Sequence, residues 1–221
     1  MIQYLIDNIP IEDFDVHVSK SKGVIGMPKP KERRRVEYAD MNGAFVDTSK
    51  VVYEQREIVL DCFITKRGRI DMLDTFHRFI DIIDSAGTRR LTVALQGLEK
   101  KCLMFEVYND GDVTAEPHWD DAQDLWTFTL KLVEARPLKM VILVHPASVQ
   151  DGVVNVSIAC DGIVDIHWGD GQHTIDVSGG DYKHRYEDKY WDKSFIVISG
   201  EIESISDIAI NAEHEIIFKR V

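Results

Sequence analysis

The spacing of the apolar residues is the feature that most constrains how this chain can fold. Nearly every apolar stretch alternates with a period of two, which is typical of strands that bury one face. Residues 53–65 (YEQREIVLDCFIT) show the pattern clearly, and the apolar face carries Ile58, Leu60, Cys62 and Ile64. Residues 125–134 (LWTFTLKLVE) repeat it. We therefore expect a mainly β protein built from antiparallel strands.

One segment follows the helical period instead. Its apolar residues recur at i, i+4, i+7, i+8 and i+11, and they are Met72, Phe76, Phe79, Ile80 and Ile83. Asp71 is a suitable N-cap, and Gly87 stands where a helix of this length would stop. The sequence therefore predicts one amphipathic helix packed against an N-terminal antiparallel β-sandwich or barrel.

Turn signals divide the rest of the chain into short strands. In the first part we expect strands at 4–6, 9–18, 90–95, 101–108 and 113–117, the last two joined by a hairpin turn at 109–112. A boundary is expected near 135–137. After it, strands are expected at 140–144, 153–160, 163–168, 173–177, 195–199 and 216–218, a spacing typical of a small β-sandwich. We predict two domains, 1–139 and 140–221.

Charge is distributed unevenly. The chain carries a net charge of −12, yet residues 20–35 (KSKGVIGMPKPKERRR) hold seven basic residues against one acidic residue, a net charge of +6. Glycine and proline interrupt this segment, so a long exposed loop is expected. It has no interleaved aromatic residue for base stacking, and the acidic remainder disfavours nucleic-acid binding. We expect Arg33, Arg34 and Arg35 to contact an acidic neighbour, such as a second copy of this chain.

Several protein classes are disfavoured. No apolar run approaches the ~18 residues needed to span a bilayer, and the N-terminus has no basic region before an apolar core, so neither a membrane span nor a signal peptide is expected. Cys62, Cys102 and Cys160 are isolated, which argues against a disulfide framework and fits folding in a reducing compartment.

Candidate catalytic and metal sites are weak. His77 and Asp81 have a spacing that can hold a metal, and Asp74 and Asp84 are near, but a solvated helix face explains them better. The run His118-Trp119-Asp120-Asp121 reads as an acidic loop. A third cluster surrounds a glycine turn and comprises His167, Asp170, His173 and His184. Nucleophile and phosphate-binding motifs are absent from the sequence. We predict no catalytic residue, metal or cofactor, and keep a metal-dependent hydrolase at His167 and His173 as a remote alternative.

The order of elements resembles a known family. A strand at 13–18, a broken loop, the turn segment 40–47 (DMNGAFVD), the strand segment 53–60 (YEQREIVL) and then the helix are ordered as in distal tail proteins of long-tailed phages. The resemblance covers about residues 1–140. It implies a β-sandwich with one helix, similar to the tail-tube subunit, and a ring of six copies that joins the tail tube to the tip or baseplate.

The second part resembles a different module. The sequence Ile166-His167-Trp168-Gly169-Asp170-Gly171, then His184-Arg185-Tyr186 and an alternating strand, is similar to PKD-like β-sandwiches of the immunoglobulin type. The resemblance implies structural roles for Trp168, Gly169, Asp170, Gly171, His184 and Tyr186, with Asp170 bracing the turn. Residues 187–193 (EDKYWDK) depart from the usual compact turn. Tyr190 and Trp191 there either contact a partner or cover the edge of the sandwich.

These patterns favour a structural phage or prophage tail protein that forms a ring. The expected partners are other copies of the chain, the tube subunit and the tail-tip protein, without a membrane or sequence-specific nucleic acid. The expected location is the virion tail, assembled in the cytoplasm of a bacterial host. The alternative is a carbohydrate- or surface-binding protein that uses its PKD-like domain.

Overall fold

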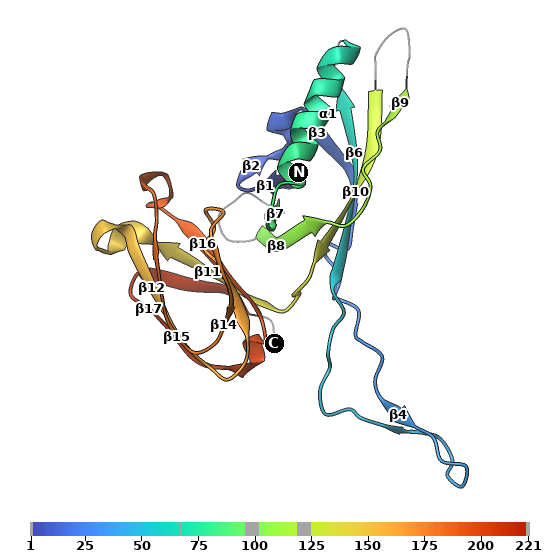
Figure 1. Cartoon of the computed structure of the whole chain (residues 1–221), viewed down its shortest axis with the longest axis vertical. Helices are drawn as coiled ribbons and strands as arrows, with labels where there is room; N and C mark the ends of the chain where they lie inside the picture. Colours follow the sequence, from blue (N-terminus) through green and yellow to red (C-terminus); the bar gives the residue numbers. More distant parts are fainter. Residues whose placement is uncertain (1, 67, 96–101, 119–124, 220–221) are drawn as a thin grey trace.

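The computed structural model describes residues 2–66, 68–95, 102–118 and 125–219. Figure 1 shows two β-rich parts lying side by side, with a long arm that projects away from both. The protein is mainly β with antiparallel sheets, as the alternation predicted. No helix in the described ranges has the length and apolar character needed to cross a membrane.

The N-terminal part is built on one large antiparallel sheet with the strand order β2-β1-β7-β8-β10-β6-β3. Its strands are β1 (Gln3–Ile6), β2 (Ile9–Pro10), β3 (Val16–Lys22), β6 (Arg56–Thr65), β7 (Arg89–Ala94), β8 (Cys102–Asn109), β9 (Glu116–His118) and β10 (Leu125–Glu134). A short 3-10 helix, η1 (Ile11–Phe14), precedes β3. The path ends at β2 and β3, so the described strands form an open sheet rather than the barrel that was the alternative prediction.

The helix α1 (Arg69–Ile83) packs on this sheet and buries the predicted stripe. Phe79 is fully buried, with its ring 5.8 Å from that of Phe14. Burying such a side chain contributes about 1.5–3 kcal/mol. The predicted N-cap was wrong, because the helix starts one turn earlier at Gly68 and Asp71 lies inside the first turn. An acidic residue is favourable there as well, since it faces the positive end of the helix dipole.

The predicted hairpin at 109–112 was also wrong. β7 runs along one side of β8, and at the end of β8 next to the turn the other side is occupied by β10 through Tyr108 and Asn109, so the next strand cannot start a hairpin there. The chain turns at Asp110, whose N–H donates to Lys131 O at 2.9 Å. β9 then pairs with the opposite end of β10, where Leu125 faces His118.

The C-terminal part is a sandwich of two sheets. One sheet has the order β14-β13-β16-β11-β18 and the other β15-β12-β17. Their strands are β11 (Lys139–His145), β12 (Val153–Cys160), β13 (Val164–His167), β14 (His173–Val177), β15 (Gly180–Arg185), β16 (Ser194–Gly200), β17 (Ile205–Ile210) and β18 (Glu213–Lys219). Short 3-10 turns lie at η2 (Pro146–Ser148), η3 (Gln150–Gly152), η4 (Asp188–Tyr190) and η5 (Ile202–Ser204).

β15 and β17 were not predicted from the sequence. Both lie at the edges of the smaller sheet, where alternate residues remain exposed and apolar periodicity is weak. The sandwich has its own core, in which Trp168 and Tyr186 are the largest fully buried side chains. The division into domains 1–139 and 140–221 stays a prediction about folding units, and so does the PKD-like identity of this sandwich.

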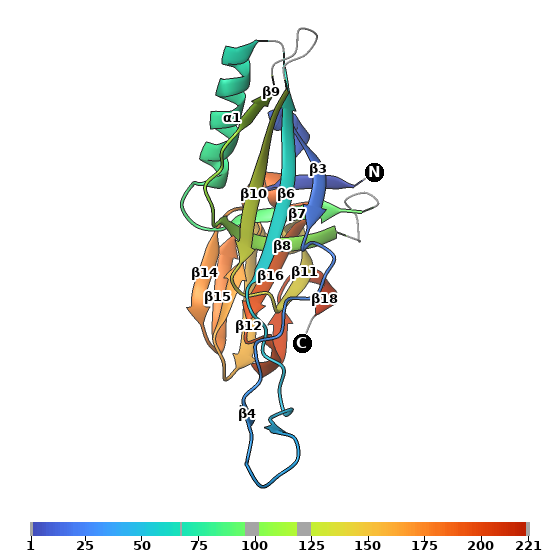
Figure 2. The same cartoon turned by 90° about the vertical axis from the view of Figure 1, so that its right-hand side faces the viewer.

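The arm is the segment between β3 and β6. Its two limbs run side by side, with Lys31 N donating to Val52 O and Glu54 N to Lys29 O, both at 2.7 Å. Farther out, β4 (Arg35–Val36) pairs with β5 (Phe45–Val46). The chain reverses between them, where Gly43 has a φ of +85° that suits glycine. Figure 2 shows that the arm extends well beyond the sheet from which it emerges.

Candidate functional site

The arm exposes side chains that contribute nothing to either core. Between residues 29 and 50, every residue except Val36 is exposed. Large apolar side chains are among the exposed residues of the arm, including Ile25 at 80% and Phe45 at 70%. Exposed apolar side chains gathered on one extended segment mark an interaction surface.

The three consecutive arginines lie on this arm. Arg33, Arg34 and Arg35 are all exposed, and none forms an ion pair within the part of the chain that the structure describes. Other arm residues do pair: Lys29 with Glu54 at 2.9 Å and Lys50 with Glu203 of the C-terminal part at 2.7 Å. The charge of the three arginines is therefore available to a partner.

The root of the arm is fixed firmly. Arg56 donates through Nη1 to Gly23 O at 2.9 Å and to Gly26 O at 2.6 Å, and Val24 between them is buried in the N-terminal core. Gly23 has a φ of +85°, and a Cβ there would lie 2.0 Å from Glu57 O. Only glycine fits this approach, so the first limb leaves the sheet in a defined direction.

A buried ion cluster lies behind the arm root. Glu134 accepts a hydrogen bond from Arg56 Nε at 3.1 Å through one oxygen and pairs with Lys139 Nζ through the other. Burial lowers the pKa of Lys139, and the Arg56 charge adds to this effect against the attraction of Glu134. Burial likewise raises the pKa of Glu134. The low-dielectric surroundings therefore penalise both charges, and the pairing of Glu134 with Lys139 and Arg56 offsets this penalty.

A second buried pair lies at the seam between the two β-rich parts. Arg90 on β7 pairs with Glu106 on β8 at 2.5 Å, and the same guanidinium donates to Phe195 O at 2.5 Å and His167 O at 3.3 Å in the C-terminal part. Asn8 adds a bond to Gly169 O at 3.2 Å. Side chains of the N-terminal part thus donate hydrogen bonds to three backbone carbonyls of the C-terminal part, those of His167, Gly169 and Phe195.

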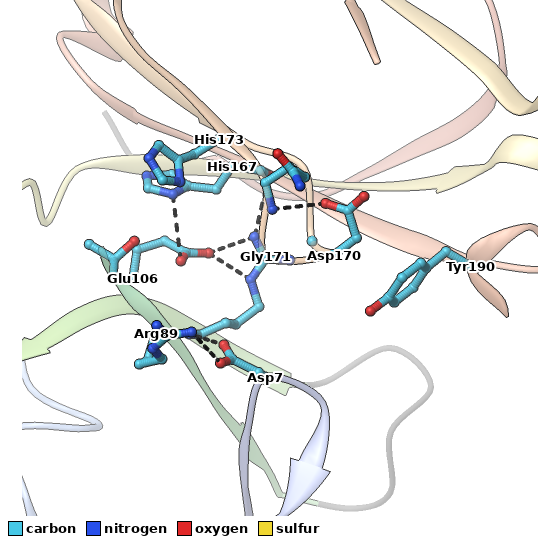
Figure 3. A pocket seen from close by; sticks show the side chains of 12 residues that line it. Asp7, Arg89, Glu106, His167, Asp170, Gly171, His173 and Tyr190 are labelled. Carbon is cyan, nitrogen blue, oxygen red and sulfur yellow. Dashed lines mark hydrogen bonds and ion pairs between the residues drawn. The ribbon is translucent and has the colours of Figure 1, made fainter. Parts of the chain in front are cut away.

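The seam also contains a titratable histidine. His167 Nδ1 lies 3.6 Å from Glu106 Oε2. Burial lowers the pKa of His167, although the Glu106 carboxylate opposes this. Burial alone would raise the pKa of Glu106, but Arg90 and His167 outweigh it and hold that pKa below its ordinary value. Figure 3 shows Glu106 and His167 facing each other across the seam, beside a cavity of about 180 Å³.

The residues of the tryptophan-glycine turn come together in the structure. Asp170 accepts from Gln172 N at 3.0 Å across the turn and from His184 Nε2 at 2.7 Å. His184 stacks on Trp168 with ring centroids 4.8 Å apart, and Tyr186 donates to Trp168 O at 2.7 Å. These contacts tie the turn to β15. Gly169 and Gly171 both have positive φ, and a Cβ on Gly169 would lie 2.7 Å from Arg90 Nη1.

The histidines of the third candidate cluster point to different partners. His167 faces Glu106, His184 faces Asp170, and the His167 and His173 rings lie 6.2 Å apart. Over the described ranges, no group of three or more His, Cys, Asp or Glu side chains could hold a metal ion. This finding gives the hydrolase alternative no support.

The other candidate residues lie apart from the seam. His77, Asp81 and Asp74 are exposed on α1, and Asp84 accepts from Asn109 Nδ2 at 2.8 Å. His118 is exposed on β9, 3.3 Å from Thr127 Oγ1, whereas Trp119, Asp120 and Asp121 lie outside the described residues.

Tyr190 and Trp191 are half-buried. Both pack against the core of the sandwich, and Trp191 Nε1 donates to Tyr186 O at 3.0 Å. A Cβ on Gly152 would lie 2.5 Å from Trp191 Nε1, so this indole covers the edge of the sandwich closely. The geometry favours the covering role for Trp191, while Tyr190 also lines the seam cavity.

The burial of Arg56, Arg90 and Glu134 was not predicted from the sequence. Arg56 and Glu134 lie on the inward faces of β6 and β10, in step with Leu60 and Leu130, and Arg90 is buried in β7. A charged residue at an inward position of an alternating strand is the signal that could have found them. Such a residue needs a buried partner.

Comparison with known proteins gives a limited result. No protein-family profile matches the sequence, and no curated protein matches it. Among solved structures, the chain is similar to the SPP1 Dit (gp 19.1) protein, described as a paradigm of the hub adsorption apparatus in phages that infect Gram-positive bacteria. The TM-score is 0.49 at 11% identity, over 97% of this chain and 99% of that chain. Similarity at this level does not assign the chain to a family.

Proposed function

We propose that this protein is a structural tail component of a phage or prophage, whose copies assemble through their arms into a ring. The ring would link the tail tube to the tail tip or baseplate, within the virion tail. The exposed arm is the observation that carries the proposal. An extended segment with apolar and basic side chains outside both cores has a physical reason to exist only when a partner covers it.

Charge supports a second copy as that partner. Residues 20–35, which comprise the end of β3 and the first limb of the arm, have a net charge of +6, whereas the whole chain has −12. Every copy therefore offers both a basic first limb of the arm and an acidic body. Complementary charge of this kind steers association and fixes its register. A contact between different surfaces of identical subunits closes into a ring when its rotation allows.

The order of elements supports the tail assignment. The resemblance to distal tail proteins rests on a strand, a long arm, a second strand and a helix, and these correspond to β3, the arm, β6 and α1. Six copies, a tube subunit and a tail-tip protein as neighbours, and assembly in the host cytoplasm are the finer parts of this proposal.

The test is the molar mass in solution, measured by light scattering after size exclusion across a range of concentrations. We expect the wild-type protein to reach a closed oligomer, near six copies. The combined change Arg33→Glu, Arg34→Glu and Arg35→Glu should weaken each contact about 3- to 150-fold, since a surface ion pair contributes about 0.2–1 kcal/mol. The melting temperature of the monomer should stay unchanged, because these arginines have no ion pair within the described chain.

A matched control separates the arm from net charge. Lys183→Glu, Arg185→Glu and Lys189→Glu make the same reversal on exposed residues of the C-terminal part, and should leave assembly intact. Equal assembly of the arm variant and the control variant would contradict a role for the arm. A strictly monomeric wild-type protein would contradict self-assembly of the chain.

A second candidate function is a carbohydrate- or surface-binding module. An open hollow of about 530 Å³ at the end of the sandwich favours it; the residues around it are Arg185, Tyr186, Glu187, Asp188, Lys189 and Trp191. Trp191 is the half-exposed aromatic side chain of this hollow, and tryptophan is enriched at interfaces. Glycan-array binding by the full chain, abolished in Trp191→Ala, would favour this function. An array without signal would contradict it.

A further inference from the structure

One carboxylate lies between the arm and the connection that joins the two β-rich parts. Glu134 is the last residue of β10 and Lys139 the first of β11, so their ion pair closes over the four-residue connection 135–138. The other oxygen of Glu134 holds Arg56, and Arg56 holds the Gly23 and Gly26 carbonyls at the arm root. An unbroken series of contacts thus runs from the arm root through Arg56, Glu134 and Lys139 to β11.

Every ionic link in this series is buried. The exposed fraction of the side chain is 7% for Arg56, 2% for Glu134 and 6% for Lys139. Both cations also lie over the same ring, that of Phe105, with Lys139 Nζ 4.1 Å and the Arg56 guanidinium carbon 5.3 Å from its centroid. Among the described residues, Glu134 is the sole hydrogen-bond acceptor of Lys139. If one cation shifts, the carboxylate and the other cation must adjust, because both cations share one buried carboxylate.

The molecule has room for such an adjustment. An apolar cavity of about 290 Å³ separates the arm root from the C-terminal part. Val24 and Ile25 line it on the arm side and Val141 and Phe218 on the other, with Lys139 and Phe105 in its wall. Close-packed interiors resist small displacements, whereas a cavity lets neighbouring segments shift without repacking a core.

We propose that Glu134 couples the arm to the connection between the two parts, so that capture of the arm by a neighbouring copy changes the freedom of the C-terminal part. The biological meaning rests on the proposed function of the arm. The coupling itself is a property of one chain. It is therefore measured on dilute monomer, where failure of ring assembly has no influence on the result.

The test measures distances between pairs of spin labels. Cys102→Ser and Cys160→Ser remove the two half-buried thiols, and Cys62 is buried. One pair, Lys31→Cys and Asp74→Cys, reports the arm against α1. Another pair, Asp74→Cys and Asp161→Cys, reports the C-terminal part against α1. All three label positions are exposed.

Each perturbation is made on one side and measured on the other. Lys139 forms no hydrogen bond or ion pair with a described arm residue. Lys139→Met should nevertheless increase the population of molecules whose 31–74 distance lies outside the wild-type range at least about fivefold, which is the lower end of typical coupling between sites. Lys183→Met, an exposed change in the same part, should not. Conversely, Arg56→Lys keeps the charge but shortens the reach to the arm carbonyls, and should broaden the 74–161 distances. Its control is Lys29→Met on the arm.

Two results would overturn the coupling. One is a 31–74 distribution in Lys139→Met that superimposes on that of the wild type. The other is equal broadening in Lys183→Met, which would show a general loosening. If Lys139→Met fails to fold, Glu134→Gln takes its place, because it keeps the shape of the side chain and removes the shared charge. Both distributions should then broaden, and an unchanged pair would refute the proposal.

Discussion

Replacing Arg90 with methionine tests the seam most directly. The guanidinium is 6% exposed, pairs with Glu106 at 2.5 Å and donates to two backbone carbonyls of the C-terminal part. Methionine keeps most of the volume but leaves the Glu106 carboxylate buried without its main partner. Breaking a buried pair in this way costs about 3–5 kcal/mol. Since a domain is stable by only about 5–15 kcal/mol, the variant should lose a large share of its stability.

The assay is urea unfolding followed by tryptophan fluorescence. Trp126 lies in the core of the N-terminal part and Trp168 in the core of the C-terminal part, so each part carries a reporter. We expect the wild-type chain to unfold with both parts coupled and Arg90→Met to unfold in two separated steps. The neighbouring Arg89→Met is the control. Arg89 is 20% exposed and pairs with Asp7 at 3.2 Å, a contact that contributes roughly 0–1 kcal/mol.

The double variant Arg90→Met and Glu106→Gln identifies the cause. Removing the unpaired charge should regain part of the lost stability, because a neutral amide costs less to bury than a carboxylate. A loss below about 1 kcal/mol in Arg90→Met, or a double variant less stable than the single one, would refute the reasoning.

Three further outcomes are expected. Gly23→Ala should destabilise the chain by about 1 kcal/mol or more in urea unfolding, because its Cβ would lie 2.0 Å from Glu57 O at a φ of +85°, whereas Gly26→Ala, with no atom within 4 Å, should not. Burial lowers the pKa of His167 below its ordinary 6.5. At a pH just below 6.5, the imidazole is therefore protonated in the unfolded chain but still neutral in the folded chain. The free energy of unfolding should therefore decrease as the pH is lowered below about 6.5. The decrease should be less steep in His167→Gln than in the exposed control His118→Gln. Burial raises the pKa of Cys62 to about 12, so iodoacetamide should alkylate it far more slowly in native than in denatured protein, as mass spectrometry would show. Equal rates would contradict this burial.

The sequence predicted those parts of the fold that repeat a simple period. The alternation over β6 and β10 and the stripe of α1 placed the N-terminal core correctly, because burying one face imposes those patterns. The exposed arm followed from its glycines, prolines and charge. The pairing of β9 with β10 did not, since pairing depends on which edges remain free after distant strands have joined. β15 and β17 were not predicted, because strands at an exposed edge have few apolar residues in alternation.

The candidate site also has residues that could be predicted from the sequence and residues that could not. The tryptophan-glycine turn was recognisable from local sequence, and its residues do meet through Asp170, His184 and Trp168. The buried pairs were not recognisable, because Arg90 is far along the sequence from the Phe195 and His167 carbonyls to which it donates. No local pattern specifies a partner about a hundred residues away. The prediction that Arg56 turns away from the apolar face of its strand was wrong, because Arg56 is buried in step with Ile58 and Leu60 and binds Glu134 and Gly23.

The seam has a consequence for how the C-terminal part can diversify. Arg90 and Asn8 bind it through the carbonyl oxygens of His167, Phe195 and Gly169, which any amino acid would supply in the same backbone geometry. These three hydrogen bonds therefore depend on the path of the main chain and on the absence of a side chain at Gly169. Side chains add the contact of His167 with Glu106 and the packing of Met104 against Val141 and Val197. The outward residues of β15 and β17 are free to change without weakening this attachment. Evolution, or a protein engineer, can therefore change what the outer surface binds while the contacts between the two parts stay the same.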